Sequence, residues 1–314
     1  MVAPALTTTR RISAIVLAGL VLASCGDDGG ALPTAATNTG TTADSAGRSV
    51  PASALTTIDE LMAAMGDDDL DALVELATGP AAAFFTIVRH GQLVAGPGAQ
   101  PPFPNLRVEP SDPSLVEPGV VRLPGPAGYA FTGPGAPPPR VFTDLEFHEI
   151  DGTWKLRTFL RNDVPIDEWV TRPPIDPVVT SGPISIRSLG RFIDIGCQTG
   201  SDPNCPSEAR DVVAVNFVIS SDASSPLEFV PSTLPDGTQA PGWLESATGA
   251  AHVPSDAQST PLEPGAMVFV TAHFVGVDDP LGPSTLHVTF RVEDELHQLG
   301  VPVPGFPGNW DTPG

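Results

Sequence analysis

The second half of the chain alternates hydrophobic and polar residues with a period of two, in short runs separated by turn-forming residues. The runs are "ISIRSL", "RFIDIG", "VVAVNFVIS", "LEFV", "AMVFVTAHF" and "TLHVTFRV". In the third and last runs, the hydrophobic residues that share a face are Val213, Val215, Phe217 and Ile219, and Leu286, Val288, Phe290 and Val292. Regular short strands with this alternation are typical of packed antiparallel sheets. The pattern therefore predicts an all-β sandwich over residues 183–304.

The first half of the chain begins with helical patterns instead. The run Thr57–Glu60 matches a capping box for a helix over "IDELMAAM", which we expect to end at Gly66. Asp67 is placed to cap a second helix over "DDLDALVELAT". The next apolar segment, "AAAFFTIVRHGQLV", fits either the end of a helix or a strand, and its pattern does not decide between them.

A Pro- and Gly-rich stretch follows, from Gly96 to Arg140, which favours loops or short edge strands. Two clear strands come next, "VFTDLEFHEI" and "TWKLRTFL", on either side of Asp151-Gly152. An Asp-Gly pair between alternating segments predicts a tight β-hairpin. In its second strand, alternation places four residues on one face: Trp154, Leu156, Thr158 and Leu160.

The order of two predicted helices, a Pro- and Gly-rich segment and a hairpin containing "DGTWKL" resembles that of the NTF2-like superfamily. The resemblance implies an α+β domain over residues 55–170, with helices wrapped against a curved sheet. A Pro-punctuated, stiff linker is expected at 171–182 and a tail at 305–314. The strand spacing of the predicted sandwich, residues 183–304, is similar to that of immunoglobulin-like domains of the DUF4352 and MPT63 type, which are found in exported bacterial proteins.

The N-terminus carries a targeting pattern. Arg10 and Arg11 precede an apolar run, Ile12–Ser24, that is shorter than the roughly 20 residues needed to span a bilayer. This arrangement is typical of a secretory signal peptide, and Ser13 lies where a twin-arginine signal has a bulky apolar residue, which favours general secretion.

The end of that run, Leu22-Ala23-Ser24-Cys25, resembles the lipobox of bacterial lipoproteins. The resemblance implies removal of residues 1–24 as a signal peptide and acylation of Cys25. Residues 25–54 then form a flexible tether, because their small polar composition cannot bury a core. We therefore expect a lipid-anchored protein on the extracytoplasmic face of the cell membrane.

Composition limits the partners. The chain has 37 acidic and 15 basic residues and a net charge of −22, so nucleic acid and anionic lipid headgroups should repel it. Membrane attachment is thus expected through covalent lipid alone, and the expected partner is an envelope protein or a cell-wall component. The abundance of Ala, Gly and Pro is typical of a high-GC bacterium such as an actinobacterium.

Two further cysteines, Cys197 and Cys205, bracket the turn-rich segment "QTGSDPN". An even pair in an exported protein favours a disulfide. The alternative, a metal site, lacks the short Cys-x₂-Cys spacing and further ligands nearby. The acidic cluster Asp67–Asp71 likewise lacks the register of a calcium loop, and acidic residues stabilise helix N-termini.

No catalytic motif emerges from the sequence. The chain contains no G-x-S-x-G elbow, and His148-Glu149 lacks the second histidine of a zinc-protease motif. We therefore expect a non-enzymatic interaction or structural protein without a cofactor. The alternative is a small-molecule-binding or enzymatic NTF2-like domain with an apolar pocket.

One candidate metal site remains. "AMVFVTAHF" and "TLHVTFRV" are joined by "VGVDDPLGP", and as a hairpin they would bring His273 opposite His287 on the outer face. Two imidazoles at that separation suit zinc or copper, with Asp278 or Asp279 as a further ligand. The alternative is a pair of histidines on a solvated sheet face. Trp243 and Trp310 lie among Pro and Gly residues, where they could stack on a sugar or pack at the edge of a core, and packing is favoured.

Overall fold

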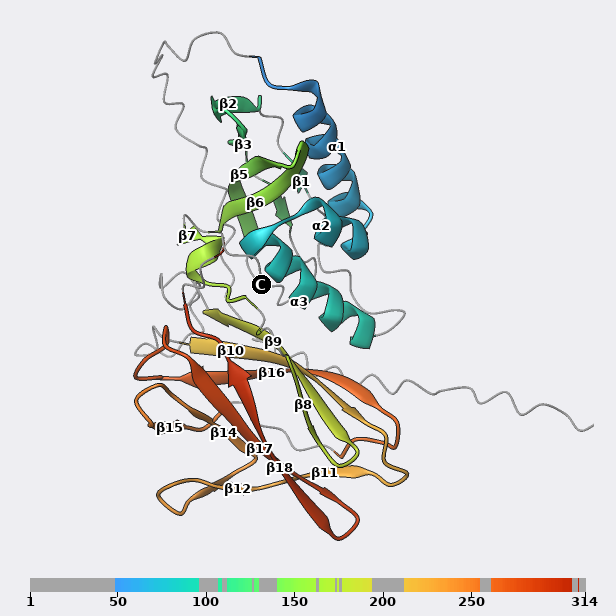
Figure 1. Cartoon of the computed structure of the whole chain (residues 1–314), viewed down its shortest axis with the longest axis vertical. Helices are drawn as coiled ribbons and strands as arrows, with labels where there is room; N and C mark the ends of the chain where they lie inside the picture. Colours follow the sequence, from blue (N-terminus) through green and yellow to red (C-terminus); the bar gives the residue numbers. More distant parts are fainter. Residues whose placement is uncertain are drawn as a thin grey trace, which may run out of the picture.

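The computed structural model describes residues 49–95, 107–108, 112–125, 127–129, 140–161, 164–172, 174, 177–193, 212–254, 261–306 and 310. Within these residues the protein is mostly β, with antiparallel sheets and three helices. Figure 1 shows two stacked parts, with the helices and one sheet above and a sandwich of two sheets below. In the described part of the chain, no helix is long and apolar enough to cross a membrane.

The helices are α1 (Ala52–Gly66), α2 (Leu70–Leu76) and α3 (Gly79–Ala95). The predicted capping box is wrong, because α1 already begins at Ala52 and Thr57 lies inside it, donating its hydroxyl to the Ser53 carbonyl at 3.2 Å. The cap of α2 is Asp69 rather than Asp67: its carboxylate accepts from the Ala72 amide at 3.1 Å. The undecided apolar segment is helical throughout, as α3.

The upper sheet is antiparallel. Its strands are β1 (Arg107–Val108), β2 (Ser114–Glu117), β3 (Val120–Leu123), β4 (Ala127–Tyr129), β5 (Arg140–Ile150), β6 (Thr153–Arg161) and β7 (Val164–Pro165), followed by a short 3-10 helix, η1 (Ile166–Glu168). β5 is central, since it pairs with β6 on one edge and with β3 and β4 on the other. The predicted hairpin is confirmed: Asp151 and Gly152 turn with φ of +50° and +77°.

The faces of β6 differ from the prediction. Trp154 and Leu156 are both buried, in keeping with a shared face, but the next buried side chain is Phe159. The β5–β6 register shifts irregularly, and Asp144 in β5 has a φ of +48°. Each shift adds an unpaired residue to one strand and turns the residues beyond it to the opposite face. The prediction that Thr158 and Leu160 share a face with Trp154 and Leu156 is therefore wrong.

The lower part is a β-sandwich. One sheet has the order β16-β10-β9-β8, from β8 (Val178–Ser181), β9 (Ile184–Ile193), β10 (Val212–Ser221) and β16 (Met267–Val275). The other contains β11 (Leu227–Val230), β14 (Gly242–Glu245), β15 (Ala251–His252), β17 (Ser284–Val292) and β18 (Glu295–Val303). A small hairpin of β12 (Ser232–Thr233) and β13 (Gln239–Ala240) lies beside the second sheet.

The sandwich core confirms the predicted faces of two strands. The predicted inward residues of β10 and β17 all belong to one buried cluster: Val213, Val215, Phe217, Ile219, Leu286, Val288, Phe290 and Val292. Over the described residues 184–193, the two predicted runs form one strand, β9. Gly190 makes this possible, because its φ is +97° and a Cβ there would lie 2.9 Å from the Thr171 hydroxyl oxygen.

The two parts meet directly. Within the stretch predicted as a linker, β8 is a strand of the sandwich, and the Thr171 amide donates to the Arg191 carbonyl at 3.0 Å. Ile87 of α3 packs with Leu189 and Val218 on the outer face of the β9–β10 sheet. Figure 1 shows α3 immediately above these strands. The predicted linker is therefore incorporated into the fold at both of its ends.

Candidate functional site

The three cysteines on which the sequence predictions rest, Cys25, Cys197 and Cys205, lie outside the described residues. Lipidation and the disulfide therefore stay predictions.

The predicted histidine pair is not formed. β16 pairs with β10, where His273 lies opposite Ala214, whereas β17 pairs with β14 and β18, where His287 lies opposite Trp243 and Gly300. The segment between β16 and β17 crosses from one sheet of the sandwich to the other instead of closing a hairpin. His273 and His287 are thus in different sheets, and the proposed shared metal site is wrong. Among the described residues, no group of three or more potential side-chain ligands is placed to hold a metal ion.

His287 belongs to a different cluster, on the outer face of its sheet. Its ring stacks on Trp243, with centroids 4.1 Å apart and planes 14° apart. Its Nε2 lies 2.8 Å from Glu245 Oε2. Trp243 is buried and packs with Leu234 and Ala240 beneath the β12–β13 hairpin. The indole is buried and His287 stacks on it, so packing rather than sugar stacking accounts for Trp243.

A second cluster lies at one end of the sandwich. His252 Nε2 is 2.8 Å from Asp278 Oδ1, and the Thr248 hydroxyl donates to the other oxygen of the same carboxylate. Ser246 Oγ lies 3.0 Å from Thr248 Oγ1. Hydrogen bonds from Thr248, Ser246 and His252 hold the pKa of Asp278 far below its ordinary value.

The order of groups in this cluster decides its chemistry. An activated nucleophile needs its hydroxyl beside the imidazole, with the carboxylate on the far side of the ring. Here the hydroxyl of Thr248 donates to Asp278, and the carboxylate stands between Thr248 and His252. These hydrogen bonds connect the turn between β14 and β15 to the segment between β16 and β17, and they do not activate a hydroxyl.

A third cluster lies on the upper sheet. Glu146 accepts from Arg122 at 2.9 Å, and its other oxygen is 2.8 Å from His148 Nε2. Burial by itself would raise the pKa of Glu146, but the bonds to His148 and Arg122 outweigh it and lower this pKa below its ordinary value. None of these three clusters of hydrogen-bonded side chains was predicted from the sequence. Only Glu146 and His148 carried a local signal, because residues two apart on a strand share a face.

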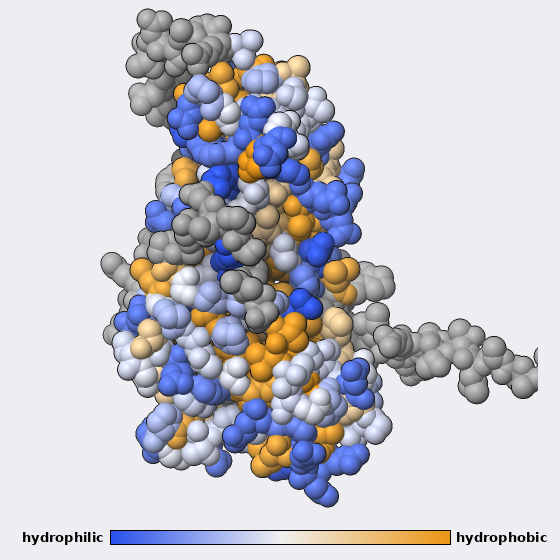
Figure 2. Space-filling view, in the orientation of Figure 1, coloured by the Kyte–Doolittle hydropathy of each residue, from blue (hydrophilic) through white to orange (hydrophobic). Residues whose placement is uncertain are grey.

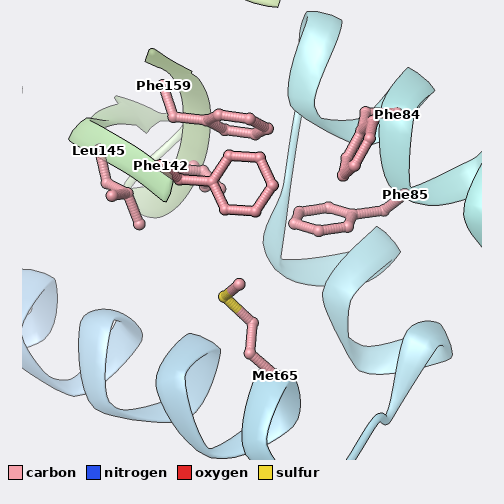
Figure 3. A pocket seen from close by; sticks show the side chains of 7 residues that line it. Met65, Phe84, Phe85, Phe142, Leu145 and Phe159 are labelled. Carbon is pink, nitrogen blue, oxygen red and sulfur yellow. The ribbon is translucent and has the colours of Figure 1, made fainter. Parts of the chain in front are cut away.

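The interior of the upper part bears on the alternative of a ligand pocket. Figure 3 shows side chains from α1, α3, β5 and β6 converging on one space; the lining residues are Met65, Phe84, Phe85, Phe142, Leu145, Leu156 and Phe159. The space that remains between these side chains is about 10 Å³, close to the least that holds one water molecule. The Phe142 and Phe159 rings meet edge to face, with centroids 4.9 Å apart. Aromatic side chains thus fill this interior.

No family model, no curated protein and no solved structure matches the chain.

Proposed function

We propose that this protein is a lipid-anchored envelope protein whose folded part acts by binding a partner and not by catalysis. The single observation that carries the proposal is the run Leu22-Ala23-Ser24-Cys25 at the end of a short apolar segment. An acyl chain contributes about 0.8 kcal/mol per buried methylene, so two chains on Cys25 provide a stable anchor without a basic surface. That route suits a chain with a net charge of −22.

The folded part extends the proposal. We assign the upper part to the NTF2-like type and the sandwich to the immunoglobulin-like type. Three helices followed by an antiparallel sheet, and a sandwich of two antiparallel sheets, support these assignments. Folds of either type serve many functions, so the activity must be argued from the sites.

The site chemistry favours binding over catalysis. In each of the three clusters, a histidine is paired with a carboxylate on the protein itself: His148 with Glu146, His252 with Asp278, and His287 with Glu245. The interior bounded by Phe84 and Phe159 is packed with aromatic rings, which argues against a pocket for a small molecule.

The surface is compatible with a protein or cell-wall partner. Hydrophilic residues dominate the face in Figure 2, and hydrophobic residues gather over the middle of the sandwich, where Figure 1 draws β8 and β9. Val178 of β8 is 39% exposed. Apolar areas bordered by polar residues are common at interaction sites. The partner we propose is an envelope protein or a wall component that meets the sandwich.

The anchor is tested by fractionating an actinobacterial host that expresses the full chain or its Cys25→Ser variant. We expect the unaltered chain in the membrane fraction and the variant released from it, with Cys197→Ser as a matched control that stays with the membrane. Equal membrane association of the unaltered chain and the Cys25→Ser variant would refute the anchor.

Binding is tested separately. The folded part would be released by cleavage in the tether and incubated with purified cell wall and with cross-linked envelope fractions. Retention that Val178→Asp weakens supports the interaction role, whereas turnover of a substrate by the released chain, lost in His252→Ala, would overturn it.

A further inference from the structure

The end of the chain returns from the sandwich to the upper part. β18 runs from the far end of the sandwich towards the junction (Figure 1) and ends at Val303. Beyond it, Phe306 and Trp310 both pack against the hydrophobic core of the upper part. Two aromatic side chains that follow β18 in the chain are thus shared between the two parts.

This segment is held on the sandwich by close backbone contacts. The Phe306 amide donates to the Leu281 carbonyl at 2.6 Å. Gly305 permits the approach, because a Cβ at that position would lie 2.8 Å from the same carbonyl oxygen and 2.8 Å from the Pro283 nitrogen. Any other residue at 305 would push the segment away from the loop between β16 and β17.

A buried arginine supports the Phe306 ring. The guanidinium of Arg191 lies 5.0 Å from the ring centroid, donates to the Gly282 carbonyl at 2.7 Å and lies 3.4 Å from the Ser284 hydroxyl. Burial lowers the pKa of Arg191 to about 10, so the side chain keeps its charge at neutral pH. A desolvated cation over an aromatic face is a strong form of this contact.

A second stacked pair holds the segment near the upper part. The guanidinium of Arg172 lies 5.6 Å from the Trp310 ring centroid and donates to the Trp310 carbonyl at 3.3 Å. Arg172 directly follows Thr171, the residue that bonds to Arg191 across the junction. One arginine–aromatic pair therefore involves β9 of the sandwich, and the other involves the residue that follows Thr171 in the connection between the two parts.

Other contacts across the junction come from β9 and α3. Ile193 of β9 is buried in the core of the upper part, with Phe192 packed against it, and Ile87 of α3 packs with Leu189 and Val218 of the sandwich. Domains of one chain usually move relative to one another unless the interface between them is large and hydrophobic. We propose that Phe306 and Trp310 form a strap that locks the sandwich against the upper part, so that the two move as one body. This proposal goes beyond the envelope function and does not depend on lipidation.

The test is hydrogen exchange on the full chain, comparing the unaltered protein with a Phe306→Ala/Trp310→Ala double variant. We expect amides in the second half of α3, next to Phe269, to exchange about tenfold faster in the variant, since a tenfold change corresponds to a loss of about 1.4 kcal/mol at the junction. Amides of β17, in the sandwich core, should change by less than about twofold.

Two matched variants sharpen the result. Leu296→Ala removes an exposed apolar side chain from β18 and should leave α3 exchange unchanged. Trp310→Phe keeps a ring for Arg172 and should restore most of the protection lost in Trp310→Ala. Unchanged α3 exchange in the double variant would overturn the strap. So would equal acceleration in α3 and β17, since that is the signature of general destabilisation.

Discussion

The imidazole of His287 lies flat on the indole of Trp243, with ring centroids 4.1 Å apart, while His273 sits in the opposite sheet of the sandwich. The stacked pair explains how a histidine on an outer sheet face is held in one orientation. The two histidines that a hairpin would have brought together are apart because β16 and β17 belong to different sheets.

This arrangement makes zinc an informative probe. Because the two histidines are in different sheets, calorimetric titration with zinc should give the same heats for the unaltered chain, His273→Ala and His287→Ala. His287→Ala should also lower the free energy of unfolding by about 0.5–1.5 kcal/mol through loss of the ring contact. A binding heat that disappears in both single variants would restore the shared metal site.

The irregular β5–β6 register gives a prediction about stability. Phe159 is buried among Phe84, Phe142 and Trp169, so Phe159→Ala should cost about 3–5 kcal/mol in urea unfolding. Thr158→Ala is the matched control, and we expect it to change stability by less than about 1 kcal/mol. If Thr158→Ala proved the more damaging of the two, the simple alternation would describe β6 better than the shifted register does.

The carboxylate of Asp278 should make stability depend on pH. Its hydrogen bonds with Thr248, Ser246 and His252 lower its pKa in the folded protein. A carboxyl group with a depressed folded pKa stabilises the protein above its unfolded pKa, and this contribution is lost as the pH falls towards the folded pKa. Asp278→Asn should therefore be less stable than the unaltered chain at neutral pH, and the difference should shrink below about pH 4.

Urea unfolding at several pH values measures this effect. Asp59→Asn, at an exposed position in α1, is a suitable control and should not alter the pH profile. A constant difference between Asp278→Asn and the unaltered chain from neutral to acid pH would contradict the assignment.

Local patterns predicted much of the fold. Alternation identified the inward faces of β10 and β17, because each strand has one face in the sandwich core. Asp151-Gly152 located the hairpin, because the turn needs two residues with positive φ. Both the strand faces and the turn are determined by residues that are close together in the sequence.

The failures have a common physical origin in contacts between distant segments. The alternation of two successive strands is the same whether they form a hairpin or lie in different sheets. The position of His273 relative to His287 is therefore set by the pairing of β16 with β10 and of β17 with β14. The register shift that buries Phe159 involves both strands of its hairpin. The pairing of His252 in β15 with Asp278 between β16 and β17 joins residues 26 apart in the sequence, and no local period marks such a contact.

The predicted bond between Cys197 and Cys205 is open to direct measurement. Peptide mass mapping of exported protein without reductant should find the two cysteines linked. By the loop-entropy estimate, reduction should lower the free energy of unfolding by about 2.5 kcal/mol. A Cys197→Ser/Cys205→Ser variant should match the reduced protein, and two free thiols in the exported protein would rule the bond out.

The most direct test of the account is the intact mass of the protein isolated from the native membrane fraction. We expect a chain that begins at Cys25 and carries the added mass of acyl chains, since the Leu22–Cys25 run resembles a lipobox. A mature chain that begins at another residue, with Cys25 absent or present as an unmodified thiol, would contradict the proposal of a lipid-anchored envelope protein.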